Sequence, residues 1–218
     1  MLLSKDPSHM PGSQESPADR FKLAAPLAGT AGQAYVEKRG VPLQVAEAAR
    51  VRFDADFGGR PAVLAPLLDC KKALTGLHGR YLHTVRGQEK MLTFGTGTGV
   101  ISVLDGWCTD PLIMVEGLFD ALSLATCNVA CIASIGRWAP WLPEVTAGRV
   151  TWLGFDASKP GEADVKLYAD RLPGADIRRL PPPPRCKDWS TALVKRGPDR
   201  VSQWIDSVLA TTGGNMHV

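Results

Sequence analysis

Residues 112–122 have the sequence LIMVEGLFDAL, in which four apolar residues lead to Glu116 and Gly117, and Asp120 follows one helical turn later. A short apolar run of this kind predicts a strand that is buried on both faces. Gly117 permits the sharp change of backbone direction that a passage from strand to helix requires. The stretch therefore predicts a buried strand that ends at a carboxylate and continues into a helix.

Residues 150–161, VTWLGFDASKPG, repeat this arrangement. An apolar strand ends at Asp156, and Ser158 with Pro160 marks the start of the next helix. In an open α/β sheet, ligands bind beyond the carboxyl ends of the strands. Acidic residues on two neighbouring strands could share a Mg²⁺ ion, which prefers a few carboxylates together with substrate phosphates.

The chain after Pro111 alternates between apolar strand patterns and helical patterns. This alternation predicts an α/β fold with a mainly parallel sheet that is flanked by helices on both faces. The expected strands are 112–116, 129–134, 150–155 and 175–180, and the expected helices are 117–126, 138–147, 160–172, 188–196 and 198–210. Four prolines at 181–184 predict a rigid connector.

The chain before Pro111 has a different pattern, which predicts a small helical plus β-rich subdomain. Residues 1–30 are rich in Pro, Ser, Gly and Ala, and we expect most of them to be flexible. Two short helices are expected at 34–40 and 42–50, and strands at 62–68, 74–83, 90–94 and 100–104. The glycine-rich residues 95–99 fit either a hairpin turn or a loop that binds phosphate.

Basic residues are concentrated in this first part of the chain. The whole chain carries a net charge of only +3, which does not by itself indicate a nucleic-acid partner. Residues 70–95, however, hold five basic side chains against Glu89 alone, a net charge of +4. The candidates for binding nucleic acid or nucleotide are Arg80, Lys90, Lys71, Lys72 and Arg86, and a solvated surface is the alternative interpretation.

Each acidic or capping residue also has an ordinary structural interpretation. Glu116 and Asp120 sit where a helix begins, and the helix dipole favours acidic residues there. Ser158 is expected to cap its helix whatever else it does. Asp188, which follows Cys186 and Lys187, is either an N-cap or an acidic group near a metal. Asp156 is harder to explain structurally, because an unpaired carboxylate at a buried strand end is costly.

The remaining composition excludes several classes of protein. The five cysteines form no CxxC pair, which fits a reducing cytoplasm better than a disulfide scaffold. No continuous apolar region marks a signal peptide at the N-terminus, and no apolar run approaches the length of a membrane span. We therefore expect a cytoplasmic protein without a membrane partner.

These residues together resemble a known family. Leu112–Leu124, Ala133–Gly136, Val150–Gly161 and Arg185–Leu193 resemble the successive motifs of a TOPRIM domain, in the branch of bacterial-type DNA primases and especially those of plasmids and phages. Ala34–Val41 resembles the helix that opens the primase core, and Leu74–Phe94 its basic β subdomain. The resemblance implies a flexible segment 1–30, a basic primase-core subdomain 31–110, a TOPRIM domain 111–210 and a flexible tail 211–218.

The resemblance also implies roles for individual residues. Glu116, Asp156 and Asp120 would be catalytic, and Mg²⁺ or Mn²⁺ would be held by Glu116, Asp156, Ser158 and Asp188. One position departs from the family, because its D-x-D reads Asp156-Ala157-Ser158 here. A hydroxyl brings no negative charge, so binding of a second ion should be weaker. No phosphate-binding GxxxxGK[ST] loop occurs, so any unwinding motor would come from another chain.

The function implied is that of a DNA-primase nucleotidyltransferase that makes short RNA primers on single-stranded DNA for a mobile element or its host. Its partners would be the template strand, nucleoside triphosphates and a replicative helicase supplied by another chain, as in a primosome. Two alternatives are a non-catalytic nucleic-acid-binding TOPRIM module and a TOPRIM nuclease.

Overall fold

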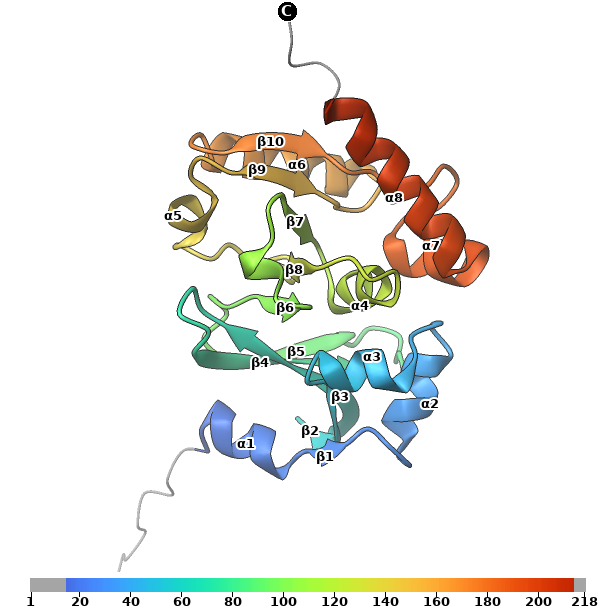
Figure 1. Cartoon of the computed structure of the whole chain (residues 1–218). Coiled ribbons are helices and arrows are strands. Elements are labelled where there is room, and N and C mark those ends of the chain that lie inside the picture. Colours follow the sequence, from blue (N-terminus) through green and yellow to red (C-terminus); the bar gives the residue numbers. More distant parts are fainter. Residues whose placement is uncertain (1–14, 214–218) are drawn as a thin grey trace, which may run out of the picture.

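The computed structural model describes residues 15–213, with side chains as far as residue 211, and contains two five-stranded sheets with helices around them (Figure 1). The elements of the first part are α1 (Pro17–Leu23), β1 (Ala25–Pro26), α2 (Ala31–Glu37), α3 (Leu43–Ala48), β2 (Arg52–Phe57), β3 (Arg60–Leu68), β4 (Leu74–Tyr81) and β5 (Met91–Gly95). Those that follow are β6 (Ile101–Val103), a 3₁₀ turn (Gly106–Cys108), β7 (Leu112–Val115), α4 (Leu118–Thr126), β8 (Cys131–Ala133), α5 (Leu142–Thr146), β9 (Val150–Leu153), α6 (Lys159–Arg171), β10 (Asp176–Arg179), α7 (Trp189–Arg196) and α8 (Pro198–Gly213).

The first sheet is antiparallel throughout, in the order β1-β2-β3-β4-β5. Its hairpin between β2 and β3 turns at Gly58 and Gly59, which both have positive φ angles (60° and 84°) that favour glycine. Strand β2 was not expected from the sequence. Its charged residues Asp54 and Asp56 alternate with small or aromatic ones, and only Phe57 of this strand is buried.

Part of the expected flexible lead-in is folded. Phe21 of α1 and Leu27 are buried, and the guanidinium Nε of Arg20 donates to Oδ2 of Asp54 on β2 at 2.6 Å. The expectation of flexibility over 1–30 is therefore wrong for residues 15–30, because two apolar side chains and one ion pair attach them to the first sheet. Residues 1–14 and 214–218 lie outside the described part.

The second sheet has the order β10-β9-β7-β8-β6. The first four strands are mutually parallel, and β6 pairs antiparallel with β8. Side chains alternate along β7, so that Ile113 and Val115 pack toward α4, α7 and α8, whereas Leu112 and Met114 pack toward α5 and α6. Helices therefore cover both faces, which confirms the predicted mainly parallel α/β sheet.

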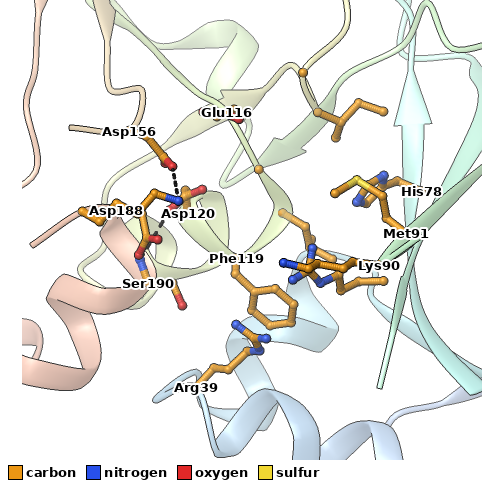
Figure 2. A pocket seen from close by; sticks show the side chains of 16 residues that line it. Arg39, His78, Lys90, Met91, Glu116, Phe119, Asp120, Asp156, Asp188 and Ser190 are labelled. Carbon is orange, nitrogen blue, oxygen red and sulfur yellow. Dashed lines mark hydrogen bonds and ion pairs between the residues drawn. The ribbon is translucent and has the colours of Figure 1, made fainter. Parts of the chain in front are cut away.

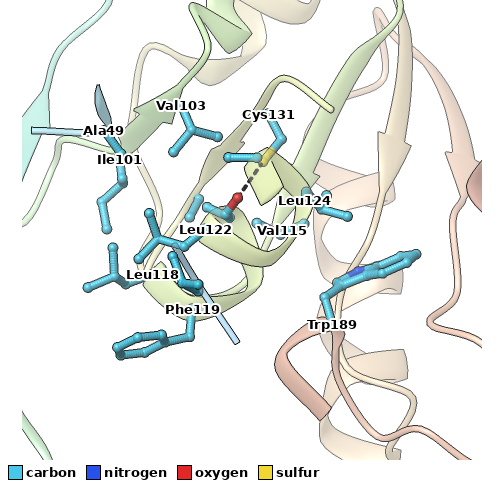
Figure 3. Close-up of a cluster of buried hydrophobic side chains, with 14 of the residues drawn as sticks. Ala49, Ile101, Val103, Val115, Leu118, Phe119, Leu122, Leu124, Cys131 and Trp189 are labelled. Carbon is cyan, nitrogen blue, oxygen red and sulfur yellow. Dashed lines mark hydrogen bonds between the residues drawn. The ribbon is translucent and has the colours of Figure 1, made fainter. Parts of the chain in front are cut away.

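One continuous apolar core joins the two sheets. It contains residues of β3, β6, α2 and α3 together with the buried face of α4. Figure 3 shows Ile101 and Val103 of β6 near Leu122 of α4. Leu68, at the end of β3, also exchanges two backbone hydrogen bonds of 2.9 Å with Val100, just before β6. Residues 95–99 therefore link strands of different sheets, so they do not form the hairpin turn. None of the helices within residues 15–213 is long and apolar enough to cross a bilayer.

Candidate active site

A cavity of about 400 Å³ lies at the carboxyl ends of β7 and β9, where it also meets the face of β4 (Figure 2). Its walls carry opposite charges. The acidic lining residues are Glu116, Asp120, Asp156 and Asp188, and the basic ones are Arg39, Arg80, Lys90 and Lys187. The cavity thus brings carboxylates of the second part of the chain together with Arg39, Arg80 and Lys90 of the first part, whereas Lys187 lies beside Asp156.

Glu116 follows β7 directly and is partly buried just before the N-terminus of α4. Gly117, the N-cap of α4, has an extended backbone and no side-chain cap. Burial, with smaller contributions from the negative charges of Asp156 and Asp164, raises the pKa of Glu116, and Lys187 opposes this effect. The interaction confirms that Glu116 and Asp156 lie close together, as their positions after parallel strands predict.

Asp120 lies in the first turn of α4 and connects that helix to α7. Its Oδ1 accepts the backbone N–H groups of Trp189 at 3.0 Å and Ser190 at 3.4 Å. Burial, then the charges of Asp188 and Asp156, raise the pKa of Asp120 to about 7. The carboxyl of Asp120 is therefore held at the site by α7, with a proton bound in about half of the molecules at pH 7.

Asp156 follows β9, and its side chain is only 16% exposed. The ammonium Nζ of Lys187 lies 3.1 Å from its Oδ2, and this contact raises the pKa of Lys187. A backbone hydrogen bond also fixes the loop that carries Lys187, because the carbonyl of Lys187 accepts the N–H of Ala157 at 2.7 Å. The sequence predicts Asp156 as a site residue, but not Lys187 as its cationic partner.

Ser158 and Asp188 both cap helices. The hydroxyl of Ser158 accepts the N–H of Gly161 at 3.2 Å at the start of α6, and Oδ1 of Asp188 accepts the N–H of Thr191 at 2.6 Å at the start of α7. Asp188 nevertheless lines the cavity, whereas Ser158 does not. The capping interpretation therefore holds for both residues, and only Asp188 is also placed beside the other carboxylates.

These carboxyl groups determine whether the cavity suits a divalent cation. Within residues 15–213 no three or more His, Cys, Asp and Glu side chains are arranged to hold a metal by themselves. Mg²⁺ requires only one or two carboxylates when phosphate and water oxygens complete its shell. Burial is the main reason why the pKa values of Glu116 and Asp120 are raised, and the charge of Asp156 adds to both, so a cation would compensate negative charge here. The donor set thus suits a cation that is shared with phosphate oxygens.

The structure divides the five basic candidates into two groups. Arg80 on β4 and Lys90 before β5 line the cavity opposite the carboxylates. Lys72 lies outside it, with its ammonium 3.0 Å from Oδ1 of Asp105. Lys71 and Arg86 are exposed and also lie outside the cavity.

Four residues near the carboxylates were absent from the candidate set: Arg39, His78, Asp164 and Lys187. Arg39 lies in the helical segment that resembles the primase core, and Lys187 precedes Asp188, so both had a signal in the sequence. The guanidinium of Arg39 lies over the ring of Phe119, 4.3 Å from its centroid. Asp164 lies inside α6 and had no such signal, and His78 lies within Leu74–Phe94 but is neither one of its lysines or arginines nor a carboxylate.

No protein-family model matches the sequence, and no curated protein matches it at the threshold applied. Solved structures do match. The zinc-binding and RNA polymerase domains of the Aquifex aeolicus primase give a TM-score of 0.64 at 16% identity, over 91% of this chain and 63% of that one. The chain therefore spans less than two thirds of that relative.

Two further matches are complexes with DNA. A DnaG primase catalytic domain bound to single-stranded DNA gives a TM-score of 0.64 at 20% identity, over 88% of this chain and 77% of that one. The RNA polymerase domain of Mycobacterium tuberculosis primase, bound to double-stranded DNA with a 6-nucleotide overhang, gives 0.68 at 14% identity, over 87% and 78%. These likenesses lead to one conclusion: this chain has the fold of bacterial-type DNA primase catalytic cores.

Proposed function

We propose that this protein is a DNA-primase-type nucleotidyltransferase that makes short RNA primers on single-stranded DNA with Mg²⁺ or Mn²⁺. The observation that carries the proposal is the cavity itself. In the fold of primase cores, an acidic wall of Glu116, Asp120, Asp156 and Asp188 faces a basic wall that includes Arg80 and Lys90. The substrates of nucleotidyl transfer, a triphosphate and a polyanionic strand, require both kinds of wall.

Glu116 and Asp156 are the residues that would hold the cation, with Asp188 beside them. The bound cation would neutralise phosphate charge and favour departure of pyrophosphate. In the reaction, the 3′ oxygen of the growing primer forms a bond to the α-phosphorus, and the bond between the α- and β-phosphates breaks.

The cationic side chains position the anionic reactants. Arg80 and Lys90 bind phosphates of the nucleotide or the template. Lys187, which compensates the charge of Asp156 in this structure, would be free to contact a phosphate if a cation took over that role. Asp120 holds the first backbone N–H groups of α7 and so keeps Asp188 at the edge of the cavity.

The test is incorporation of labelled nucleoside triphosphates on single-stranded DNA with either cation. We expect product from the wild type and a loss of at least 100-fold in Glu116→Gln, which removes the charge and preserves the shape. Glu144→Gln, an exposed site on α5, is the matched control and should retain activity. Absence of product from the wild type with both cations, or equal product from Glu116→Gln, would refute the proposal.

A second candidate is a nucleic-acid-binding module without catalysis. The contact of Lys187 with Asp156 favours it, because an ammonium ion already compensates the main carboxylate after β9. This alternative predicts that single-stranded DNA binding persists in Glu116→Gln and Asp156→Asn, whereas synthesis is absent in every variant and in the wild type. Nicking of a plasmid with Mn²⁺ would instead indicate a nuclease.

A further inference from the structure

His78 is a buried polar residue on the wall of the cavity that the proposed chemistry does not use. It lies in the middle of β4, where side chains alternate between two faces. Leu77 and Tyr81 pack into an apolar core with Phe57, whereas His78 and Arg80 line the cavity. His78 is only 4% exposed, and within the described part of the chain its Nδ1 has no hydrogen-bond partner.

An unpartnered buried nitrogen requires an explanation. Leaving such an atom unsatisfied costs free energy, and a leucine or methionine at this position would avoid that cost. A ligand that forms a hydrogen bond with the ring would explain why a histidine occupies this wall of the cavity, although no described group of the protein pairs with its Nδ1.

The surroundings of His78 determine which kind of ligand group suits it. Burial, followed by the positive charges of Arg80 and Arg137, lowers the pKa of His78 to about 4. The ring is therefore neutral at pH 7, with one nitrogen that donates and one that accepts. Such a ring matches an uncharged polar partner, while Arg80 and Lys90 are the groups that match phosphate.

The position of His78 in the cavity supports the same conclusion. Figure 2 shows His78 beside Met91, on the opposite side of the cavity from Asp156 and Asp188. Met91 pairs with Arg80 across β4 and β5, and Met91 and Ile135 add apolar groups to the cavity lining. A nucleotide whose phosphates reach from the carboxylates to Arg80 and Lys90 would place its sugar and base along the face of β4 that also carries His78.

We propose that His78 forms a hydrogen bond with an uncharged polar group of the nucleoside, either a ribose hydroxyl or a base edge, of the nucleotide bound in this cavity. The inference rests on the proposed function, and it adds a residue that selects the nucleoside rather than the phosphates.

The experiment compares two ligands by calorimetry in Mg²⁺: ATP, and inorganic tripolyphosphate, which has no nucleoside. His78→Phe keeps a planar ring and removes both nitrogens. We expect it to weaken ATP binding about 5-fold and to leave tripolyphosphate binding unchanged, as loss of one neutral hydrogen bond predicts. His78→Gln restores a donor and an acceptor and should recover part of the ATP affinity. His83→Phe, at an exposed position outside the cavity, is the control.

Further ligands distinguish the two sources of the bond. If His78 contacts the 2′-hydroxyl, the wild type prefers ATP to dATP and His78→Phe loses that preference. If it contacts a base edge, the wild type discriminates among ATP, GTP, CTP and UTP, and the variant discriminates less.

Other outcomes would overturn the inference. Unchanged ATP binding in His78→Phe, or an equal loss for ATP and tripolyphosphate, would show that His78 does not recognise the nucleoside. If His78→Phe fails to fold, the same comparison in His78→Met decides, because methionine offers no nitrogen, and wild-type binding of ATP, dATP and all four bases by that variant would also reject the inference. A wild type that binds neither ATP nor tripolyphosphate would refute the proposed function itself, and this inference with it.

Discussion

Asp120→Asn should make the protein more stable, by an amount that grows with pH. The substitution keeps the shape of the side chain, and its amide oxygen can still accept the N–H groups of Trp189 and Ser190. What it removes is the negative charge, which burial and the neighbouring Asp188 and Asp156 make unfavourable.

The magnitude follows from the pKa. In the unfolded chain Asp120 ionises near 3.8, whereas in the folded protein its pKa is about 7. Between these values the unfolded state is ionised and the folded state holds the proton, so rising pH favours unfolding. At 1.36 kcal/mol for each pKa unit, the carboxyl of Asp120 lowers the free energy of unfolding by about 1 to 2 kcal/mol at pH 5 and by roughly 4 kcal/mol at pH 8. The variant should therefore gain about 2 to 3 kcal/mol more at pH 8 than at pH 5.

The assay is urea unfolding at both pH values, in EDTA so that no cation compensates the carboxylates. Asp170→Asn, at an exposed position on α6, is the control and should give a small difference that is the same at both pH values. A gain for Asp120→Asn that is equal at pH 5 and pH 8, or a loss of stability at pH 8, would refute the electrostatic account of this site. Adding Mg²⁺ with a nucleotide should reduce the gain, because a cation stabilises the ionised wild-type site.

Substitutions at three further residues test neighbouring features. Lys187→Met removes the ammonium 3.1 Å from Asp156, so Mn²⁺ should bind several-fold more tightly by calorimetry; unchanged or weaker binding would contradict competition for that carboxylate. Ser158→Ala should lower the free energy of unfolding by about 1 kcal/mol through loss of the α6 cap, whereas Ser158→Asp should retain the cap; equal stability of the wild type and the Ala variant would argue against capping. Trp189→Ala should cost about 3 to 5 kcal/mol in urea unfolding, because the ring is fully buried and its Nε1 donates to the carbonyl of Gly154 at 2.8 Å; a cost below about 1 kcal/mol would show that the site does not depend on this packing.

The sequence was most informative where one local pattern had a single physical solution. The apolar runs before Glu116 and Asp156 can be buried on both faces only inside a parallel sheet covered by helices, and the structure has that sheet. The carboxyl ends of parallel strands lie at one edge, so the proximity of these two carboxylates followed from the same reasoning.

The sequence was less informative where partners come from distant parts of the chain. Residues 95–99 have the glycines of a hairpin, but their flanking strands pair with β4 and β8 instead of each other. In the sequence nothing distinguishes Lys187 from an ordinary exposed lysine. In the structure, the loop after β10 places it against Asp156. The exposed Lys72 forms an ion pair with Asp105, a contact 33 residues away that charge density along the chain does not show.

The pairing of β6 with β8 affects how this protein can be divided for experiments. A fragment that starts at Pro111 would lack the strand bearing Ile101 and Val103, and the backbone of β8 would be left as an open edge prone to self-association. A fragment meant to isolate the second sheet should begin upstream of Val100. Even then, apolar residues of α4 that normally contact the first part of the chain would face water, so we expect the two halves to be expressed better as one polypeptide.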